Sequence, residues 1–373
     1  TVLKKPAKQA NSPNVNIWTT GYYTCRQCLQ VFFASNLWYS VNIFHLLGGN
    51  SMEKDYVTRI NLKTATNERE KLIDFCLHGK NQCKNQFLAI GWSCVNFESD
   101  DYSAFYDTVV EYVHGQNRRL NPALKIFKEA RVNDLFWTRD LNGVYWICRV
   151  KNHAKAYLNK ELDIGAILPV KAYALGLEVP GQIKASFNRA RGGIVQRLHY
   201  PAITEYSKFV FNKLLSEDPN KEPDEAYYNV NSTIANNVIE NLPDFELEEL
   251  VISYLQIVKG YYLLSNSIAN KSTTVKIECQ LISRDVNNVK KAVVQVKGPK
   301  AGELDALSFK EYEDKGYYIY LYARDIKNLE EMKNVIRIST QELQAFYTEY
   351  KAILPESITQ FENLFNIGVS EKK

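Results

Sequence analysis

The spacing of apolar and polar residues predicts a mixed chain of helices and strands that begins near residue 55. Apolar residues at i, i+3 and i+4 predict helices, and alternation with polar residues predicts half-buried strands. The predicted helices cover residues 68–78, 102–115, 121–131, 202–216, 229–241, 245–258, 303–314 and 340–351. The predicted strands cover residues 55–64, 86–91, 134–138, 143–150, 261–264, 274–282, 291–297 and 317–323. Asn142-Gly143 stands between two of these strands and predicts a hairpin.

Composition supports a globular chain of several domains. The 373 residues are 45% hydrophobic and 24% charged, values that exclude collagen, coiled coil and general disorder. The seven cysteines are few and odd in number. A disulfide scaffold is therefore not expected, and a reducing, cytoplasmic location is.

The first 51 residues differ from the rest of the chain. They hold no acidic residue, and Lys4, Lys5, Lys8 and Arg26 account for the whole net charge of +4. The remaining residues are neutral overall, so bulk charge gives no argument for a nucleic-acid partner. The stretch 31–47 is too polar to span a bilayer, and no membrane association is expected.

The first methionine of the chain is Met52, which follows Gly48-Gly49-Asn50-Ser51. We expect this methionine to be the natural start. The segment 1–51 would then be a leader or the product of upstream translation, and a genuine N-terminal appendage is the alternative interpretation.

The segment 245–323 carries the residue pattern that points to chemistry. Gln295 and Lys297 are two apart on a predicted strand and share a face. Glu278 lies on the polar face of the preceding strand, and Glu248 borders the buried face of the helix before it. Carboxylates can hold a hard divalent cation, and a lysine can stabilise a developing oxyanion. This combination is typical of phosphodiester hydrolysis, although an ordinary α/β domain with exposed polar residues has the same pattern.

These residues resemble the PD-(D/E)XK nuclease core, and most closely its Mrr-like branch of restriction endonucleases. The resemblance implies that Glu278, Gln295 and the carbonyl of Val296 bind Mg²⁺ or Mn²⁺. It assigns Lys297 as the catalytic lysine and Glu248 as the helix glutamate. The motifs that carry the resemblance are Glu278, the run Gln295-Val296-Lys297-Gly298 and the run Leu247-Glu248-Glu249-Leu250-Val251.

The resemblance covers about residues 245–325. Gln295 stands where an acid is usual, and Glu278 stands where Asp is commoner. An inactive nuclease fold therefore remains an alternative.

The segment 85–190 resembles the PUA/EVE-like β-barrels that are fused to restriction nucleases. The resemblance rests on residues 87–93, residues 132–140 and the strand Gly143-Val144-Tyr145-Trp146-Ile147-Cys148-Arg149-Val150. It implies recognition of a flipped, modified base in an aromatic cage. Trp92, Ser93 and Trp137 are the candidate residues of that cage, although tryptophans of small barrels commonly belong to the core.

A basic run follows the predicted barrel and is a candidate for phosphate contacts. Its positive residues are Lys184, Arg189, Arg191 and Arg197. A solvated linker is the alternative interpretation. Beyond it, residues 205–249 hold eleven acids and three lysines. That acidic segment is expected to be a scaffold or a protein contact.

The predicted fold class is a multidomain α+β and α/β chain. It has an appendage at 1–51, a PUA/EVE-like domain at 52–180, a basic connector and helical linker at 181–242 and a PD-(D/E)XK nuclease domain at 243–373. The predicted function is a modification-dependent, Mg²⁺-dependent restriction endonuclease of a prokaryotic phage-defence system. Its expected partners are double-stranded DNA and a second copy of the chain, because two active sites cut two strands.

Three alternative functions stay open. One is a nucleic-acid sensor with an inactive nuclease fold, another is an RNase, and the third is a structural partner in a defence complex. Cys25 and Cys28 form a lone CxxC that lacks the further ligands of a zinc site. No phosphate-binding GxxxxGK[ST] motif or Gly-x-Ser-x-Gly elbow occurs in the sequence.

Overall fold

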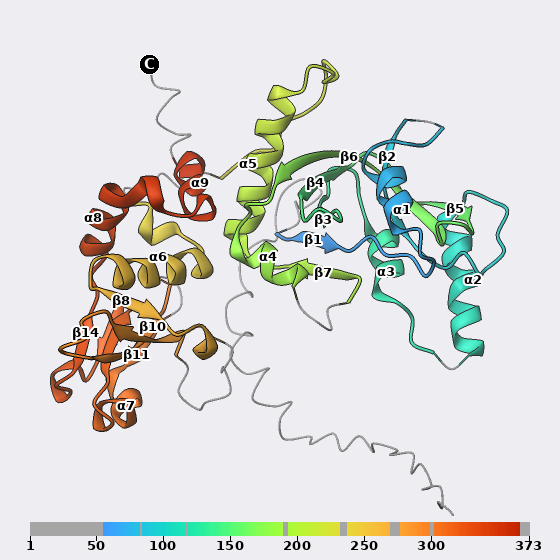
Figure 1. The fold of residues 1–373 in the computed structure, drawn as a ribbon. Coiled ribbons are helices and arrows are strands. Elements are labelled where there is room, and N and C mark those ends of the chain that lie inside the picture. The colour runs from blue at the N-terminus through green and yellow to red at the C-terminus, as the bar shows by residue number, and fades with distance from the viewer. Residues whose placement is uncertain are drawn as a thin grey trace, which may run out of the picture. The chain divides into compact units, whose positions relative to one another are not determined.

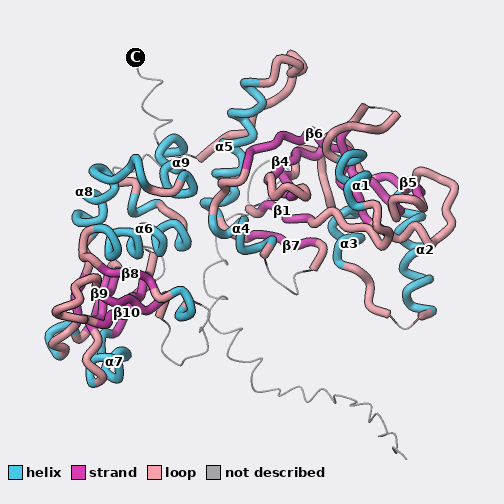
Figure 2. The backbone as a smooth tube through the Cα atoms, viewed as in Figure 1, coloured by secondary structure: helices cyan, strands magenta, loops and turns pink. Residues whose placement is uncertain are grey.

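The computed structural model describes residues 55–82, 84–116, 118–188, 193–231, 237–268, 277–298 and 302–365 (Figure 1). These residues belong to one compact unit, 53–373. Its fold is mixed α+β, as predicted, and the strands gather into two large sheets (Figure 2). The expected appendage at 1–51 lies outside the described residues.

The elements alternate along the chain in a mixed order. The α-helices are α1 Arg69–Cys76, α2 Tyr102–Gly115, α3 Pro122–Glu129, α4 Gly181–Phe187, α5 Pro201–Glu217, α6 Asp244–Ile257, α7 Lys310–Asp314, α8 Thr340–Tyr350 and α9 Glu356–Phe365. The strands are β1 Val57–Ile60, β2 Gln86–Ile90, β3 Leu135–Arg139, β4 Tyr145–Val150, β5 Lys155–Asn159, β6 Ile164–Gly176, β7 Val195–Leu198, β8 Tyr261–Leu263, β9 Cys279–Ser283, β10 Lys291–Val296, β11 Glu303–Asp305, β12 Tyr318–Tyr322, β13 Asp325–Lys327 and β14 Val335–Arg337. Short 3-10 helices are η1 Ile239–Asn241, η2 Ser265–Ser267, η3 Ala306–Phe309, η4 Leu329–Glu331 and η5 Lys351–Ile353.

The first sheet has the strand order β2-β6-β4-β3-β1-β7, and β5 also pairs with β6. Most neighbours are antiparallel, but β1 and β3 are parallel. The predicted hairpin is confirmed, because β3 and β4 pair around Asn142-Gly143. Gly143 has φ +83°, which glycine adopts without a Cβ penalty. The Asp140 carboxylate accepts hydrogen bonds from the backbone N–H groups of Asn142 and Val144 and closes the turn.

The second sheet has the order β14-β12-β10-β9-β8. Strands β8, β9 and β10 form an antiparallel meander, and β12 then pairs parallel to β10. Helix α6 precedes the meander, and α7 lies in the connection from β10 to β12. The order helix, strand, strand, strand, helix, strand is the one that the sequence predicts for residues 245–323.

Alternation along the strands divides the second sheet between two hydrophobic cores. Cys279, Leu281, Val294 and Val296 pack with the apolar face of α6 in one core. On the opposite face, Val293 of β10 packs with Ile319 and Leu321 of β12 and with η3 in a second core. The sheet is therefore covered on both faces, and only its strand ends and edges are left to build a site.

The prediction that residues 181–242 form a connector and linker between domains is wrong. Its strand β7 pairs antiparallel with β1 and completes the first sheet. Helix α5 places Ile203, Phe211 and Leu215 in the core, each fully buried. A segment that buries this much apolar surface belongs to the folded unit rather than to a hinge.

Two predicted helices also differ from the structure. Residues 229–231 and 237–238 are not helical, and the Asn237 side chain instead caps η1 by accepting the Ile239 N–H. The predicted helix 303–314 begins as strand β11, and Asp305 then caps η3. Asn and Asp side chains bond to nearby backbone groups and favour caps over helix interiors.

The assignment of Trp137 to a base-reading cage is wrong, because this side chain is 0% exposed. Its ring stacks on Tyr206, with centroids 6.4 Å apart, and its Nε1–H donates to Ser207 Oγ at 2.9 Å. The indole therefore joins β3 to α5 inside the core. Hydrophobic periodicity alone does not separate such a residue from one that lines a pocket.

We expect Trp137→Phe to lower the free energy of unfolding by about 2 kcal/mol, because it removes a buried hydrogen bond and some packing. Urea denaturation measures this loss. Leu177→Ala, at a position 59% exposed, is the control and should change stability little. An unchanged unfolding midpoint for Trp137→Phe would contradict the buried role.

Candidate active site at the end of the second sheet

Helix α6 approaches the sheet because its sequence has one strong apolar face. Leu247, Leu250, Val251 and Leu255 recur at helical spacing, and each is fully buried. Asp244 and Glu246 lie in the first turn, where acidic groups interact favourably with the helix dipole. The helix thus holds these two carboxylates in different places, Asp244 against Gly298 after β10 and Glu246 against Gly181 of α4.

The end of the β9–β10 ladder brings Glu278 to Gln295. The ladder pairs Leu281 with Ala292 and Cys279 with Val294, and Glu278 lies directly before β9. The Glu278 N–H donates to the Val294 carbonyl at 2.9 Å, one residue out of that register, so the regular ladder ends at Cys279. Alternation along β10 puts Gln295 on the face opposite α6, and the hydrogen bond to its amide holds the Glu278 carboxylate beside it.

The Gln295 amide occupies the centre of this arrangement and is 4% exposed. Its Nε2 donates to Glu278 Oε1 at 2.5 Å and to the Val296 carbonyl at 3.0 Å. Its Oε1 is buried and has no hydrogen-bond partner. A buried polar atom of this kind is costly unless another group satisfies it.

Lys297 continues β10 by one more step. Its backbone N–H donates to the Tyr322 carbonyl at 2.7 Å, so the chain keeps its parallel pairing beyond Val296. The side chain is half-buried, and its amine has no ion-pair partner among the described residues. Alternation puts Lys297 on the face of Gln295, with their Cα atoms roughly 7 Å apart.

Glu248 lies on α6 and is half-buried. Burial, followed by the negative charges of Glu278, Glu249 and Glu248, raises the pKa of the Cys279 thiol to about 12. The predicted helix glutamate and strand glutamate are thus close enough to act on one buried thiol. Glu248 approaches from the α6 face, whereas Glu278 projects from the opposite face.

Asp244 is a further carboxylate that the sequence interpretation missed. A Cβ at Gly298 would collide with its Oδ1, so this carboxylate touches the backbone directly after Lys297. Asp244 and Glu248 are four residues apart and share one side of α6. That spacing was visible in the sequence, but only the structure shows that Asp244 meets the end of β10.

The donor set fits a hard divalent cation through oxygen atoms. Glu278 Oε1 and the Val296 carbonyl both lie around the Gln295 amide, which could turn to present its orphaned Oε1 to the same point. No group of three or more His, Cys, Asp and Glu residues that could hold a metal occurs in the described ranges. The site therefore combines one carboxylate with neutral oxygens.

The other predicted site residues do not form one cluster. Ser93 is buried, and its hydroxyl donates to Asp163 Oδ1 at 2.7 Å. Trp92 is half-buried and has φ +79°, which is strained for a bulky residue.

The predicted basic run is divided in the structure. Lys184 pairs with Glu178 at 2.6 Å, and Arg197 pairs with Glu129. Each of these two side chains therefore has an acidic partner within the protein, with which a phosphate would have to compete. Arg189 and Arg191 lie outside the described residues.

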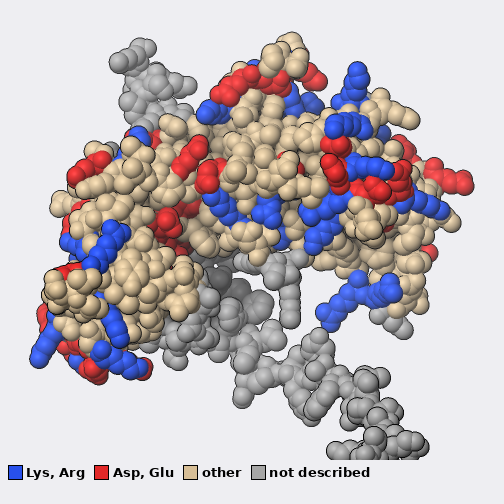
Figure 3. All heavy atoms as spheres, in the orientation of Figure 1, with Lys and Arg blue, Asp and Glu red and all other residues tan. Residues whose placement is uncertain are grey.

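Comparisons of the chain with protein-family models, with curated proteins and with solved structures found no match. Among the described residues, no helix is long and apolar enough to cross a bilayer. The visible face in Figure 3 intersperses basic and acidic side chains.

Glu246 is the most strongly shifted carboxyl near the site. It is 2% exposed and accepts the Gly181 N–H at 2.5 Å, while its Oε2 has no partner. Burial raises its pKa from 4.5 to about 7, and the hydrogen bond from Gly181 opposes this shift. The carboxyl thus titrates at the contact between α4 and α6.

We expect stability to fall as pH rises from about 4.5 to about 7, because the folded protein keeps a proton that the unfolded chain has lost. In Glu246→Gln, which cannot titrate at this position, the free energy of unfolding should fall by about 2–4 kcal/mol less over this pH range. Urea denaturation at several pH values measures it. Glu349→Gln on α8 is exposed and should leave the slope unchanged. Equal slopes for wild type and Glu246→Gln would contradict the shifted pKa.

Proposed function

We propose that this chain is a Mg²⁺-dependent endodeoxyribonuclease of restriction type. The observation that carries the proposal is the contact between Glu278 and Gln295, with Lys297 on the same face. The topology of residues 244–322 supports it, because the order of helices and strands and the mixed pairing suit the PD-(D/E)XK core that the sequence resembles. The first sheet would be the PUA/EVE-like reading domain.

Each residue of the site has a distinct role in this proposal. Glu278, Gln295 through Oε1 and the Val296 carbonyl would hold the cation. When bound, the cation would activate water and screen the charge on phosphorus. Lys297 would hold a phosphate oxygen or the attacking water, and its ammonium would stabilise charge that develops in the transition state. Glu248 and Asp244 would orient groups from the α6 side.

The partners follow from this chemistry. Double-stranded DNA is the proposed substrate, with a modified base as the feature that is read. A homodimer would supply the two sites that cutting both strands requires. The proposed location is the cytoplasm of a prokaryotic cell, where such an enzyme meets invading phage DNA.

A nucleic-acid sensor with an inactive nuclease fold is the second candidate. The observation in its favour is that Gln295 stands where an acid is usual, which leaves Glu278 as the single carboxylate of the strand pair. Cleavage of DNA with Mg²⁺ and its loss with EDTA separate the two candidates. Parallel reactions with RNA test whether the same core acts as an RNase.

We expect Lys297→Ala to reduce DNA cleavage by about 100-fold or more, because a preorganised donor to the transition state is lost. Binding of DNA in EDTA should stay close to wild type. Digestion of modified and unmodified phage DNA gives the first readout, and fluorescence anisotropy gives the second. Lys315→Ala removes an exposed lysine directly after α7 and is the matched control. Full cleavage by Lys297→Ala would contradict the assignment of the chain as a nuclease with Lys297 as its catalytic lysine.

We expect Glu278→Gln to weaken Mn²⁺ binding by at least tenfold. In metal sites, loss of a residue that only orients a ligand lowers metal affinity about 10- to 100-fold, and loss of a ligand itself should lower it at least as much. Isothermal titration without DNA measures this affinity. Glu330→Gln changes an exposed acid elsewhere on the chain and should bind Mn²⁺ like wild type. Unchanged affinity in Glu278→Gln would remove this residue from the metal site.

A further inference from the structure

A large open groove lies on the first sheet, away from the proposed active site. Its volume is about 1000 Å³, and strands β2, β5 and β6 contribute to its lining. The loop before β2, the segment after β4 and the loop after α5 form its walls. None of the residues proposed for catalysis lines it.

Strand register explains why these residues meet on one face. Lys155 pairs with Ile167, and Phe87 pairs with Pro169, so all four side chains project to the same face of β6 and its neighbours. Tyr157 follows Lys155 by two residues, at a register shift in β5, and its ring lies in the groove against Phe75. The opposite face of these strands is packed in a hydrophobic core with α2 and α3. On the groove side, Phe75, Phe87 and Ile167 belong to the same buried cluster, so the groove opens over a largely covered part of the sheet.

Aromatic rings form one wall of the groove. Phe75 stacks on Phe87 with centroids 5.7 Å apart, and it also contacts Tyr157 at 5.7 Å. Phe75 and Phe87 are 9% exposed, but Tyr157 is 40% exposed. The buried pair thus supports an accessible ring, which is the arrangement that stacking of a flat heterocycle needs.

Four lysines line the same groove, and they differ in how firmly they are held. Lys171 contacts Glu225 at 2.7 Å and Asp218 at 3.0 Å, so it belongs to the structure. Lys155 lies 3.5 Å from Asp100, and Lys151 lies 3.5 Å from Glu225 and 3.6 Å from Glu222. Lys84 is exposed and has no ion pair within the described residues. Exposed and loosely paired lysines can exchange their partners for phosphate at little cost.

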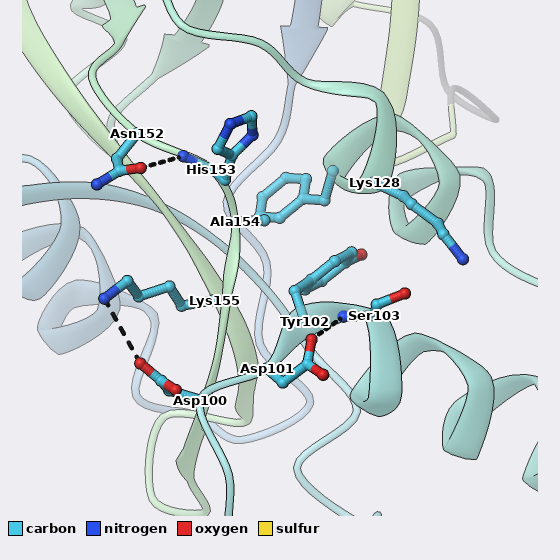
Figure 4. A pocket seen from close by; sticks show the side chains of 10 residues that line it. Asp100, Asp101, Tyr102, Ser103, Lys128, Asn152, His153, Ala154 and Lys155 are labelled. Atoms are coloured by element: carbon cyan, nitrogen blue, oxygen red, sulfur yellow. Dashed lines mark hydrogen bonds and ion pairs between the residues drawn. The ribbon is translucent and has the colours of Figure 1, made fainter.

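A second, smaller hollow adjoins the groove, and Asn152 and Lys155 line both. Figure 4 shows Lys155 reaching Asp100 across this hollow, while Asp101 caps α2 through Ser103. Two acids and two lysines, Lys128 and Lys155, line the hollow, whereas four lysines and the two acids Asp218 and Glu222 line the groove. The groove is therefore the more positive of the two surfaces.

We propose that this groove binds a single-stranded or locally opened segment of DNA, with a base on Tyr157 and phosphates at Lys84, Lys151 and Lys155. This inference rests on the proposed function, and it replaces Trp137 as the aromatic contact of the reading domain. A paired base hides its faces inside the stack, so an accessible ring in a concave site suits an unstacked base. Basic grooves that track the backbone and carry aromatic platforms bind single strands in this way.

Anisotropy of a labelled single-stranded oligodeoxynucleotide in EDTA tests the groove without cleavage. Tyr157→Leu should weaken binding about tenfold, and Tyr157→Phe should bind like wild type because it keeps the ring. The double variant Lys84→Ala with Lys155→Ala should also weaken binding about tenfold. The slope of the logarithm of the binding constant against the logarithm of salt concentration should become shallower by roughly 1.4, because two phosphate contacts are lost. The matched control, Lys125→Ala with Lys160→Ala, removes two exposed lysines outside the groove and should retain wild-type binding.

Wild-type affinity in both the Tyr157→Leu and double-lysine variants would overturn the groove proposal. The proposed nuclease would still stand if Lys297→Ala abolishes cleavage in the same preparations. Absence of cleavage by wild-type protein, with groove-dependent binding of DNA, would overturn the nuclease and retain the groove. Tighter groove-dependent binding of RNA than of DNA, or full competition by equimolar free dAMP, would overturn the assignment to a DNA strand.

Discussion

The hydrogen bond between Gln295 and Glu278 is the contact on which the proposed site depends. It joins Glu278, the residue directly before β9, to the end of β10, where the regular pairing of the two strands stops. A shift of one residue in the pairing would turn one strand over and separate Gln295 from Glu278. Strand β10 is apolar on both faces, since Val293 is as fully buried as Ala292 and Val294. The shift is opposed on β9, where Cys279 and Leu281 would leave the core beside α6 and Gln280 would enter it. The burial of β9 thus determines the geometry of the site.

An amide in place of a second carboxylate changes the electrostatics of this pair. Two carboxylates at the same distance would repel each other in a buried site without a cation. The Gln295 amide instead donates to Glu278 and to the Val296 carbonyl, and it holds both oxygens in place. The pair is therefore held together by its own hydrogen bonds, and it carries one negative charge where two carboxylates would carry two. In the proposed nuclease, the same substitution that stabilises the pair would weaken its attraction for a cation.

The sequence predicted the elements whose periodicity is strong and local. The helix α6 and strands β8, β10 and β12 lie close to their predicted bounds, and the shared face of Gln295 and Lys297 follows from alternation alone. Strand β6 was missed because it runs for 13 residues with an irregular pattern, half of it paired to β2 and β5 and half to β4. Strand β7 was missed because its pairing with β1 connects residues far apart in the chain. Long-range pairing of this kind leaves no local pattern, and the same reason hid the contact between Asp244 and Gly298.

On the first sheet, burial distinguishes aromatic residues of the core from accessible ones, and tightly paired lysines from loosely paired ones. Trp137 is closed in by α5, whereas Tyr157 lies on β5, over which the described structure leaves a groove. Lys171 is held by Glu225, which also forms a buried ion pair with Arg149 and so anchors the loop after α5 to the sheet. That anchored loop forms one wall of the groove, through Asp218, Asn220 and Glu222. The buried ion pairs therefore fix the shape of the surface, and the loosely paired lysines beside Tyr157 supply its charge. Because this wall is already ordered, little conformational entropy of the protein would be lost when a flexible strand binds. The loosely paired lysines could then leave their acidic partners for phosphates.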